Sequence, residues 1–538
     1  TDFSIGIGYQ ALRSNSGANN TVIGHQSFTS NTTGSRNTAV GSDTGLYNTS
    51  GSDNTFIGTS SGNNNGTGSY NSALGSQALA ANTSGSLNTA VGFATLSSIT
   101  TGTENTSIGA NSLKNSTTGT VNCALGVYSL YSNTTGYANC AFGDRALRAN
   151  TIGIRNIGIG GSALISNTTG SDNVGLGANS LGRILSGSNN IAIGTGSMYS
   201  NVVGSESIVL GTQALYSATS VSRAISIGSY SGFSVSAATD CVSIGHSATK
   251  SSSLVSNAVC IGNLACEQVA NILGDIYIGD ESGRLTTGTS SGVVTDSVYV
   301  GRRSSYGRSG MGMNNVAVGS KTLESATSDY TVAVGANSAR AGTHLYSVEI
   351  GNNTGSISGT YNTSVLVGYN CLGVSTSVGT ITGSTIIGSN TFNSSVVNGI
   401  SQSIILGNGL YNSYSGVNLS RVIVIDGLAS SQTASNEVTI GNGLHTTYRM
   451  YAAGWSNVSD ARDKTNIRPI SDGIELINKL KPVRFEWNTR DGTRTGVEDS
   501  GFIAQDLQEA LGEANDYLKV VNESNSEHLM VTKDGLYP

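Results

Sequence analysis

A serine and a lysine near position 459 share one short charged segment. Ser459 and Lys464 are five positions apart, with Asp460 and Arg462 between them. A serine hydroxyl becomes a good nucleophile only when a base removes its proton, and a lysine whose ammonium is desolvated can be that base. Taken alone, however, the segment is more typical of an exposed charged turn with a helix cap. The pair therefore predicts chemistry only if the surrounding elements position it.

Those elements belong to a C-terminal region of distinct composition. Residues 455–538 contain 25 of the chain's 60 charged residues, all three prolines and both tryptophans. Apolar spacing predicts a short helix over Gly473–Leu480 and a strand over Val483–Trp487, and Gly501–Leu511 predicts a second strand-to-helix step. We therefore expect residues 455–538 to form a separate small α+β domain.

Two separated motifs in this region resemble the endosialidase-type intramolecular chaperone, an autocleaving C-terminal domain of phage tail spikes and tail fibres. The matching residues are Ser459, Asp460, Arg462 and Lys464, then Gly501, Phe502, Ala504 and Gln505. The family usually ends in a long coiled-coil helix, and the last residues here show no heptad run, so we expect that helix to be missing from residues 455–538.

The resemblance implies trimerisation and trimer-dependent self-cleavage of the Val458–Ser459 bond. Ser459 would attack the carbonyl of Val458, Lys464 would be the base, and water would hydrolyse the resulting ester. Asp460 and Arg462 are assigned to local structure. The domain would then be a single-turnover Ser-Lys autoprotease, and no turnover enzyme is expected.

A 17-residue repeat fills the first half of the chain. Its marker is a glycine that closes a short run such as TVIG, TAVG or TFIG, and every step between successive markers is 17 residues from Gly24 to Gly279. Such a period is the signature of a solenoid in which each repeat forms one rung. The sequence therefore predicts an all-β shaft, a parallel β-solenoid or β-roll, over residues 1–279.

The marker also predicts how each rung is built, as in Thr38, Ala39 and Val40 before Gly41. Because side chains alternate along a strand, the outer two of these three positions share one face. We expect the Thr38 and Val40 positions to point into the rung and the small Ala39 position to face another surface. A second short segment and an Asn-rich turn complete the repeat, which predicts two strands and two turns per rung.

The small size of the rung predicts an oligomer. A 17-residue rung encloses too few apolar side chains to offset an ordering cost of roughly 1–2 kcal/mol per residue. We therefore expect a homotrimer with the small Ala and Ser positions near its axis. The NTAVG and NTTG repeats also resemble the heads of trimeric autotransporter adhesins (YadA-like heads) and phage tail-fibre stalks, over residues 3–445.

The period loosens after Gly279, and residues 280–454 are predicted to form irregular rungs with loop insertions. The segment Arg302–Met313 contains three arginines and a tyrosine in a Gly-rich loop. One interpretation is a receptor-contacting protrusion, and the other is a solvated loop without a binding role. The candidate receptor residues are Arg302, Arg303, Tyr306 and Arg308.

Composition limits the remaining functions. The net charge of -6 provides no basic stripe for nucleic acid, and no apolar run reaches the length of a membrane span, so membrane insertion is not expected. No cysteine spacing fits a metal site, and neither a metal nor another cofactor is expected. Cys123 and Cys140, at the same repeat position, are expected to be small buried side chains in a ladder rather than a disulfide.

These observations predict a structural, trimeric phage tail fibre of the virion, extracellular, that binds a host cell-surface receptor (glycan or protein) and other tail proteins. A bacterial surface adhesin or extracellular filament of the same architecture is the alternative. A glycan-cleaving enzyme is disfavoured, because it would need paired carboxylates on one face, and Asp43, Asp53 and Asp172 fall in turns without a repeated partner.

Overall fold

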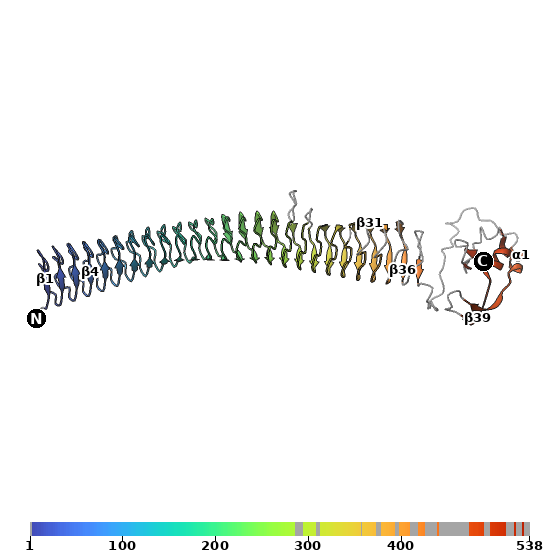
Figure 1. Ribbon diagram of the computed structural model, residues 1–538, viewed down its shortest axis with the longest axis horizontal. Helices are drawn as coiled ribbons and strands as arrows, with labels where there is room; N and C mark the ends of the chain where they lie inside the picture. Colours follow the sequence, from blue (N-terminus) through green and yellow to red (C-terminus); the bar gives the residue numbers. More distant parts are fainter. Residues whose placement is uncertain are drawn as a thin grey trace. The chain divides into compact units, whose positions relative to one another are not determined.

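The computed structural model describes residues 3–285, 294–307, 313–356, 358–372, 378–392, 397–408, 418–425, 438–440, 473–488, 495–512, 521–522 and 530–531. The chain divides into two compact units, Thr1–Ile440 and Gly441–Pro538. The first unit consists of β-strands and turns, and both helices belong to the second (Figure 1).

The first unit is a parallel β-solenoid built on one long sheet, sheet A, of 26 strands. Successive strands pair in parallel and in straight register, so that Ala39 lies opposite Phe56 in the next rung. The strands of sheet A are β1 (Ile5–Ile7), β2 (Thr21–Ile23), β3 (Thr38–Val40), β4 (Thr55–Ile57), β5 (Ser72–Leu74), β6 (Thr89–Val91), β7 (Thr106–Ile108), β8 (Cys123–Leu125), β9 (Cys140–Phe142), β10 (Ile157–Ile159), β11 (Val174–Leu176), β12 (Ile191–Ile193), β13 (Ile208–Leu210), β15 (Ile225–Ile227), β17 (Val242–Ile244), β19 (Val259–Ile261), β21 (Ile276–Ile278), β23 (Val298–Val300), β24 (Val316–Val318), β26 (Val332–Val334), β28 (Val348–Ile350), β30 (Val365–Val367), β32 (Thr385–Ile387), β34 (Ile404–Leu406), β36 (Ile423–Ile425) and β37 (Val438–Ile440).

Most of the described rungs from β14 onwards add a second strand, in two further parallel sheets. Sheet B contains β14 (Ser220–Ser222), β16 (Ala237–Thr239), β18 (Leu254–Ser256), β20 (Asn271–Leu273) and β22 (Val294–Thr295). Sheet C contains β25 (Ala326–Asp329), β27 (Gly342–Leu345), β29 (Thr360–Asn362), β31 (Val378–Thr382), β33 (Val397–Ser401) and β35 (Asn418–Ser420).

The prediction of a second strand after the marker glycine is wrong: the second strands of sheets B and C lie just before a strand of sheet A, as β16 does before β17. In the described rungs, early and late, the segment after each marker glycine is a series of turns or bends. Its residues repeatedly adopt left-handed backbone angles, with φ of 60° at Gln77 and 57° at Leu79. No extended strand has such angles, so this segment cannot form a sheet.

The side chains of sheet A face the opposite way from the prediction. Ala39, in the middle of β3, is 0% exposed, whereas Val40 is 37% exposed. The same pattern recurs along the sheet: the middle residue is buried, and the first and third are partly or largely exposed. The expectation that the Thr38 and Val40 positions fill the rung, with the Ala39 position facing a neighbour, is therefore wrong.

The reason is the narrow interior, which the middle strand residue shares with the residue six positions later. Opposite the large Phe56 the partner is a glycine, since a Cβ added at Gly62 would lie 2.7 Å from the ring of Phe56. Where the strand residue is Ala73, its partner is the buried Leu79. Side chains in cores are close-packed, so this interior has no room for the larger residues at the first and third positions.

The marker glycines are required by the backbone. From Gly8 to Gly388 their φ angles lie between 124° and 154°, a range that only glycine adopts readily. They also stack closely, because a Cβ on Gly92 would lie 2.8 Å from the carbonyl carbon of Gly109 in the next rung. The fixed spacing of these glycines in the sequence therefore records a backbone requirement of every rung.

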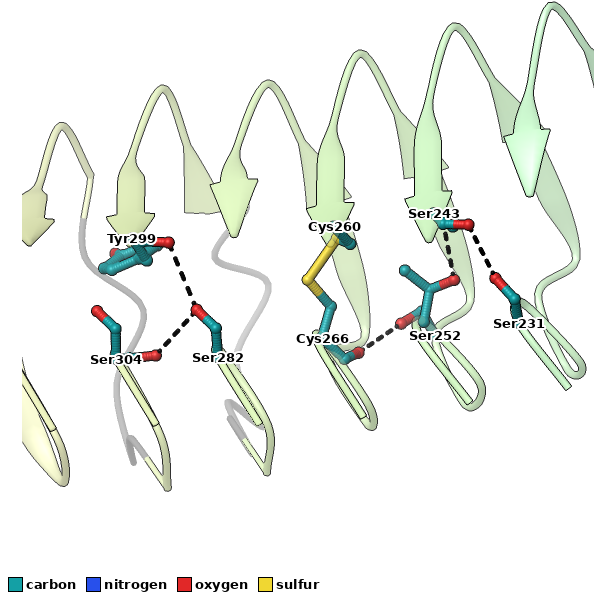
Figure 2. The surroundings of a disulfide bond; sticks show 9 residues. Ser231, Ser243, Ser252, Cys260, Cys266, Ser282, Tyr299 and Ser304 are labelled. Atoms are coloured by element: carbon teal, nitrogen blue, oxygen red, sulfur yellow. Dashed lines mark hydrogen bonds between the residues drawn. A yellow bond between two sulfur atoms is a disulfide. The ribbon is translucent and has the colours of Figure 1, made fainter. Parts of the chain in front are cut away.

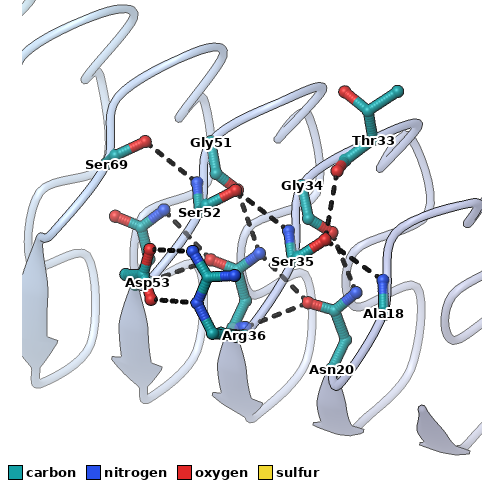
Figure 3. Close-up of polar contacts among 12 residues, drawn as sticks. Ala18, Asn20, Thr33, Gly34, Ser35, Arg36, Gly51, Ser52, Asp53 and Ser69 are labelled. Atoms are coloured by element: carbon teal, nitrogen blue, oxygen red, sulfur yellow. Dashed lines mark hydrogen bonds and ion pairs between the residues drawn. The ribbon is translucent and has the colours of Figure 1, made fainter. Parts of the chain in front are cut away.

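A stack of buried asparagines satisfies the backbone just before each early strand of sheet A (Figure 3). Asn20 donates from Nδ2 to the carbonyl of Gly34 at 2.9 Å, and its Oδ1 accepts the backbone N–H of Asn37 at 3.0 Å. The arrangement repeats rung by rung as far as Asn190. These asparagines therefore pair buried backbone groups that would be costly to leave unpaired.

The cysteines differ from the sequence-based expectations. Cys260 and Cys266 form a disulfide across one rung, between a middle strand position and the position six residues later (Figure 2). Cys123 and Cys140 are free, as predicted, but they are half-buried on the outer side of sheet A rather than in a buried ladder. That correction follows from the reversed orientation of the strands.

The second unit contains the predicted α+β elements. The helix α1 and the strand after it confirm the helix and strand predicted over Gly473–Leu480 and Val483–Trp487. A strand that ends at Gly501 and the helix after it confirm the strand-to-helix step predicted over Gly501–Leu511. The strands β38 and β39 pair antiparallel, as do β40 and β41. The elements are α1 (Gly473–Lys479), β38 (Val483–Asn488), β39 (Thr495–Gly501), α2 (Ala504–Leu511), β40 (Val521–Asn522) and β41 (Met530–Val531).

Candidate functional site

The second chaperone motif lies where β39 ends and α2 begins. Gly501 closes β39 opposite Val483, and Ala504 is the first residue of α2. Phe502 is half-buried in the connection, and Gln505 is exposed in the first turn of the helix. The motif therefore builds a tight strand-to-helix connection that directs the amide of Gln505 towards solvent.

The helix α2 is anchored by one apolar face. Leu507 and Leu511, four residues apart, are its buried residues, and residues at this spacing lie on the same side of a helix. Asp506 lies in the first turn, where its charge complements the helix dipole. Packing thus fixes α2, while its first turn keeps polar groups available on the surface.

The first chaperone motif lies outside the described residues. This applies to Val458, Ser459, Asp460, Arg462 and Lys464. The pairing of Ser459 with Lys464 and the cleavage of the bond before Ser459 therefore stay predictions.

The candidate receptor residues lie in the turn segment that follows the marker Gly301. The Arg302 side chain is 63% exposed, with its guanidinium 3.9 Å from Asp280. The Arg303 guanidinium lies over the ring of Tyr306, 4.1 Å from its centroid. Arg308 lies outside the described residues.

Arg303 belongs to a network of ion pairs between successive rungs. Its Nε lies 3.5 Å from Glu281 and 3.3 Å from Glu324. Arg284 continues the network, 2.8 Å from Glu267 and 2.6 Å from Glu281, and Arg340 pairs with Glu324 at 2.7 Å. Because Arg303 is held between two carboxylates, Arg302 is the candidate that offers the more exposed cation. Sequence reasoning missed the network, although Glu267 and Arg284 are one repeat apart.

A fully buried ionisable pair lies inside a later rung. Nδ1 of His344 is 2.6 Å from Oε1 of Glu349, and Nε2 is 2.9 Å from the carbonyl oxygen of Ala341. The imidazole stacks on Tyr361 of the next rung at 4.6 Å, and burial raises the pKa of that phenol well above its ordinary value. The pair is enclosed by the rung, so it links polar groups of the interior and has no access to a substrate.

Sequence reasoning missed this pair as well, although one signal was present. Gly355 follows Glu349 by six residues, and the carboxylate occupies the space that a side chain at Gly355 would need. The same arrangement occurs at Tyr277, whose ring occupies the space that a side chain at Gly283 would need.

The described part of the chain contains no group of three or more His, Cys, Asp or Glu residues arranged to hold a metal ion. Nor do any of its helices have the length and apolar character needed to cross a bilayer.

Comparison with known families finds a similarity in the C-terminal region. Residues 459–516 match the family model of the chaperone of endosialidase. The match begins at Ser459 and includes the β38–β39 hairpin and α2, so both sequence motifs belong to it. Searches of curated proteins and of solved structures find no match to this chain.

Proposed function

We propose that the chain is one subunit of a homotrimeric phage tail fibre, extracellular and part of the virion. The solenoid would be its shaft, and the C-terminal domain would align three chains and release itself by one cleavage. The observation that carries this proposal is the chaperone of endosialidase match at residues 459–516, which follows a parallel solenoid of 26 rungs.

The repeats themselves explain why such a shaft needs an aligning domain. Successive rungs pair in straight register and present nearly the same residues. Two chains displaced by one rung would therefore lose only the contacts at their ends. Long-range parallel β pairing also assembles slowly, and a domain that fixes the starting register would remove the displaced alternatives before the shafts associate.

Self-cleavage would proceed through an ester. The hydroxyl of Ser459 loses its proton to Lys464 and attacks the carbonyl of Val458. The Val458–Ser459 amide bond breaks, the nitrogen takes up a proton, and the acyl group stays on the Ser459 oxygen. Water then hydrolyses the ester, leaving a carboxylate on Val458 and a free hydroxyl and amine on Ser459. Once the C-terminal domain has been released, a dissociated shaft could no longer realign its three chains. The lifetime of the assembled shaft would then be set by its unfolding rate.

Host attachment would use the surface of the shaft. Arg302 is the exposed cation of the candidate set, and Tyr306 is held beside it by Arg303. A receptor that carries anionic or hydroxyl groups, a glycan or a protein, would fit this chemistry. Contacts with other tail proteins complete the proposed role.

Mass spectrometry of the purified full chain tests the cleavage. Wild type is expected to yield two products that separate between Val458 and Ser459, whereas Ser459→Ala stays intact. Ser456→Ala, a serine-to-alanine change three residues earlier, is the matched control and should cleave like wild type. An intact wild-type chain under conditions in which it is trimeric would remove self-cleavage from the proposal.

A further inference from the structure

The outer face of sheet A carries a continuous row of partly or largely exposed apolar side chains along the described strands. The first and third residues of the strands from β1 to β36 point outwards, and we call their two columns row one and row three. Row three is apolar in all of these strands of sheet A, and neither row contains a charged residue there. The face extends over ~120 Å, since rungs are spaced ~4.8 Å apart. Exposed apolar patches of more than a few hundred Å² mark interaction surfaces.

We infer that this face is where the copies of the chain meet in the trimer, an inference that rests on the proposed trimer. The partner must bury a face that repeats once per rung, in parallel and in straight register. A second copy has that same repeat, so every rung meets an equivalent rung. An unrelated globular partner would match only a few rungs and would leave the rest of the face in water.

Row one divides the interface into two zones. Between β2 and β9 it contains only Thr, Ser and Cys, whereas from β10 to β36 it contains Ile or Val except at Thr385. Burying an unpaired hydroxyl costs roughly 1–3 kcal/mol, so a column of hydroxyls is expected to stay at the hydrated edge. The copies therefore meet through row three alone in the first zone and through both rows in the second.

The two zones give the interface a direction along the chain. The wider apolar zone begins at Ile157 and extends to the end of the solenoid that precedes the chaperone-like domain in sequence. Chains aligned by that domain would first join through the zone with the larger apolar contact. The narrower zone would join last and separate first.

Single cysteines on two faces of the full chain test which side is covered. The background is Cys123→Ser with Cys140→Ser, because the remaining cysteines are buried or in the disulfide. Ile193→Cys lies in row three, and Ile152→Cys is the matched control in a turn; these isoleucines are 37% and 55% exposed in the single chain. Thr33, at the position equivalent to Ile152, lies on the opposite side of its rung from the strands (Figure 3).

Each variant is measured for particle mass by light scattering, for maleimide labelling, and for cross-linking on oxidation with copper phenanthroline. In a particle of trimer mass, Ile193→Cys should form covalent dimers and label roughly tenfold or more slowly than Ile152→Cys, which should not cross-link. A trimer in which Ile193→Cys labels freely, or Ile152→Cys cross-links equally well, would overturn the assignment of the face. A particle of single-chain mass would refute the trimer itself.

A second pair in the same background tests the two zones. Thr106→Cys and Ile208→Cys both lie in row one, in the first and second zones respectively, and both positions are exposed in the single chain. In the trimer, maleimide should label Thr106→Cys readily and Ile208→Cys slowly. Equal labelling of the two would refute the division into zones while leaving the assignment of the face intact.

Discussion

Two neighbouring glycines provide a sharp test of how the rungs stack. Gly160 is a marker glycine with φ of 126°, and a Cβ added to it would lie 2.6 Å from the carbonyl carbon of Gly177 in the next rung. Gly161, the next residue, has nothing within 4 Å of an added Cβ. Gly160→Ala and Gly161→Ala therefore make the same chemical change at adjacent positions with opposite expectations.

The cost at Gly160 has two sources. A non-glycine residue in such a backbone region costs of order 1–3 kcal/mol. The atoms that the new methyl group meets belong to the backbone, which cannot rotate away as a side chain would, so the two rungs must also separate locally. We expect a total of about 3 kcal/mol or more for Gly160→Ala, and less than about 0.5 kcal/mol for Gly161→Ala.

Hydrogen exchange of the full chain, followed by mass spectrometry, measures this locally. The N–H of Gly177 donates to the carbonyl of Ile159 at 2.8 Å, so peptides that contain Gly177 report opening between these rungs. Because about 1.4 kcal/mol corresponds to a tenfold change, exchange there should accelerate by roughly 100-fold in Gly160→Ala. It should stay within about twofold of wild type in Gly161→Ala. Similar exchange in the two variants would refute the reasoning about the marker glycines.

Three further predictions concern the polar contacts and thiols. Asn122→Ala removes the acceptor of the Asn139 N–H and the donor to the Gly136 carbonyl. Hydrogen exchange should show that rung destabilised by about 1–3 kcal/mol, whereas the control Thr118→Ala, at an exposed position, should leave it unchanged. The guanidinium of Arg155 holds the pKa of the Asp172 carboxyl below its ordinary value. The ion pair therefore stabilises the fold fully at pH values above the ordinary pKa of an aspartate. This stabilisation is lost as the pH falls through the lowered pKa of Asp172. The difference in melting temperature between wild type and Arg155→Ala should accordingly shrink in acid and in high salt, and a difference that grows in acid would contradict this sign. Burial raises the pKa of Cys123 and Cys140, so iodoacetamide should alkylate them more slowly than a free cysteine at neutral pH, with a rate that keeps rising above pH ~8.5.

Much of the solenoid could be predicted from the spacing of its glycines. The period fixes the rung, and the left-handed angle of Gly92 explains why the marker must be glycine. The inward face could not be predicted in the same way, because alternation separates two faces without stating which one is buried. The missing information was that the residue six positions after the strand centre also points into the rung. Leu79, for example, fills the interior beside Ala73.

Other differences arise from backbone conformations and contacts that composition does not reveal. Gln77 and Leu79 adopt left-handed angles that neither residue type favours, so the predicted second strand after the marker glycine could not be excluded in advance. The same six-residue spacing explains the disulfide between Cys260 and Cys266, which the sequence did not predict. In the C-terminal domain, by contrast, local apolar spacing was sufficient to place the strand that ends at Gly501 and the helix after it.

The mass of the intact particle in solution tests the central claim most directly. Ser459→Ala prevents the proposed cleavage, so sedimentation equilibrium of this full-length variant reports association alone. We expect a single species of three times the chain mass of 54.8 kDa. A stable species of 54.8 kDa, with the apolar outer face of sheet A left in water, would contradict it.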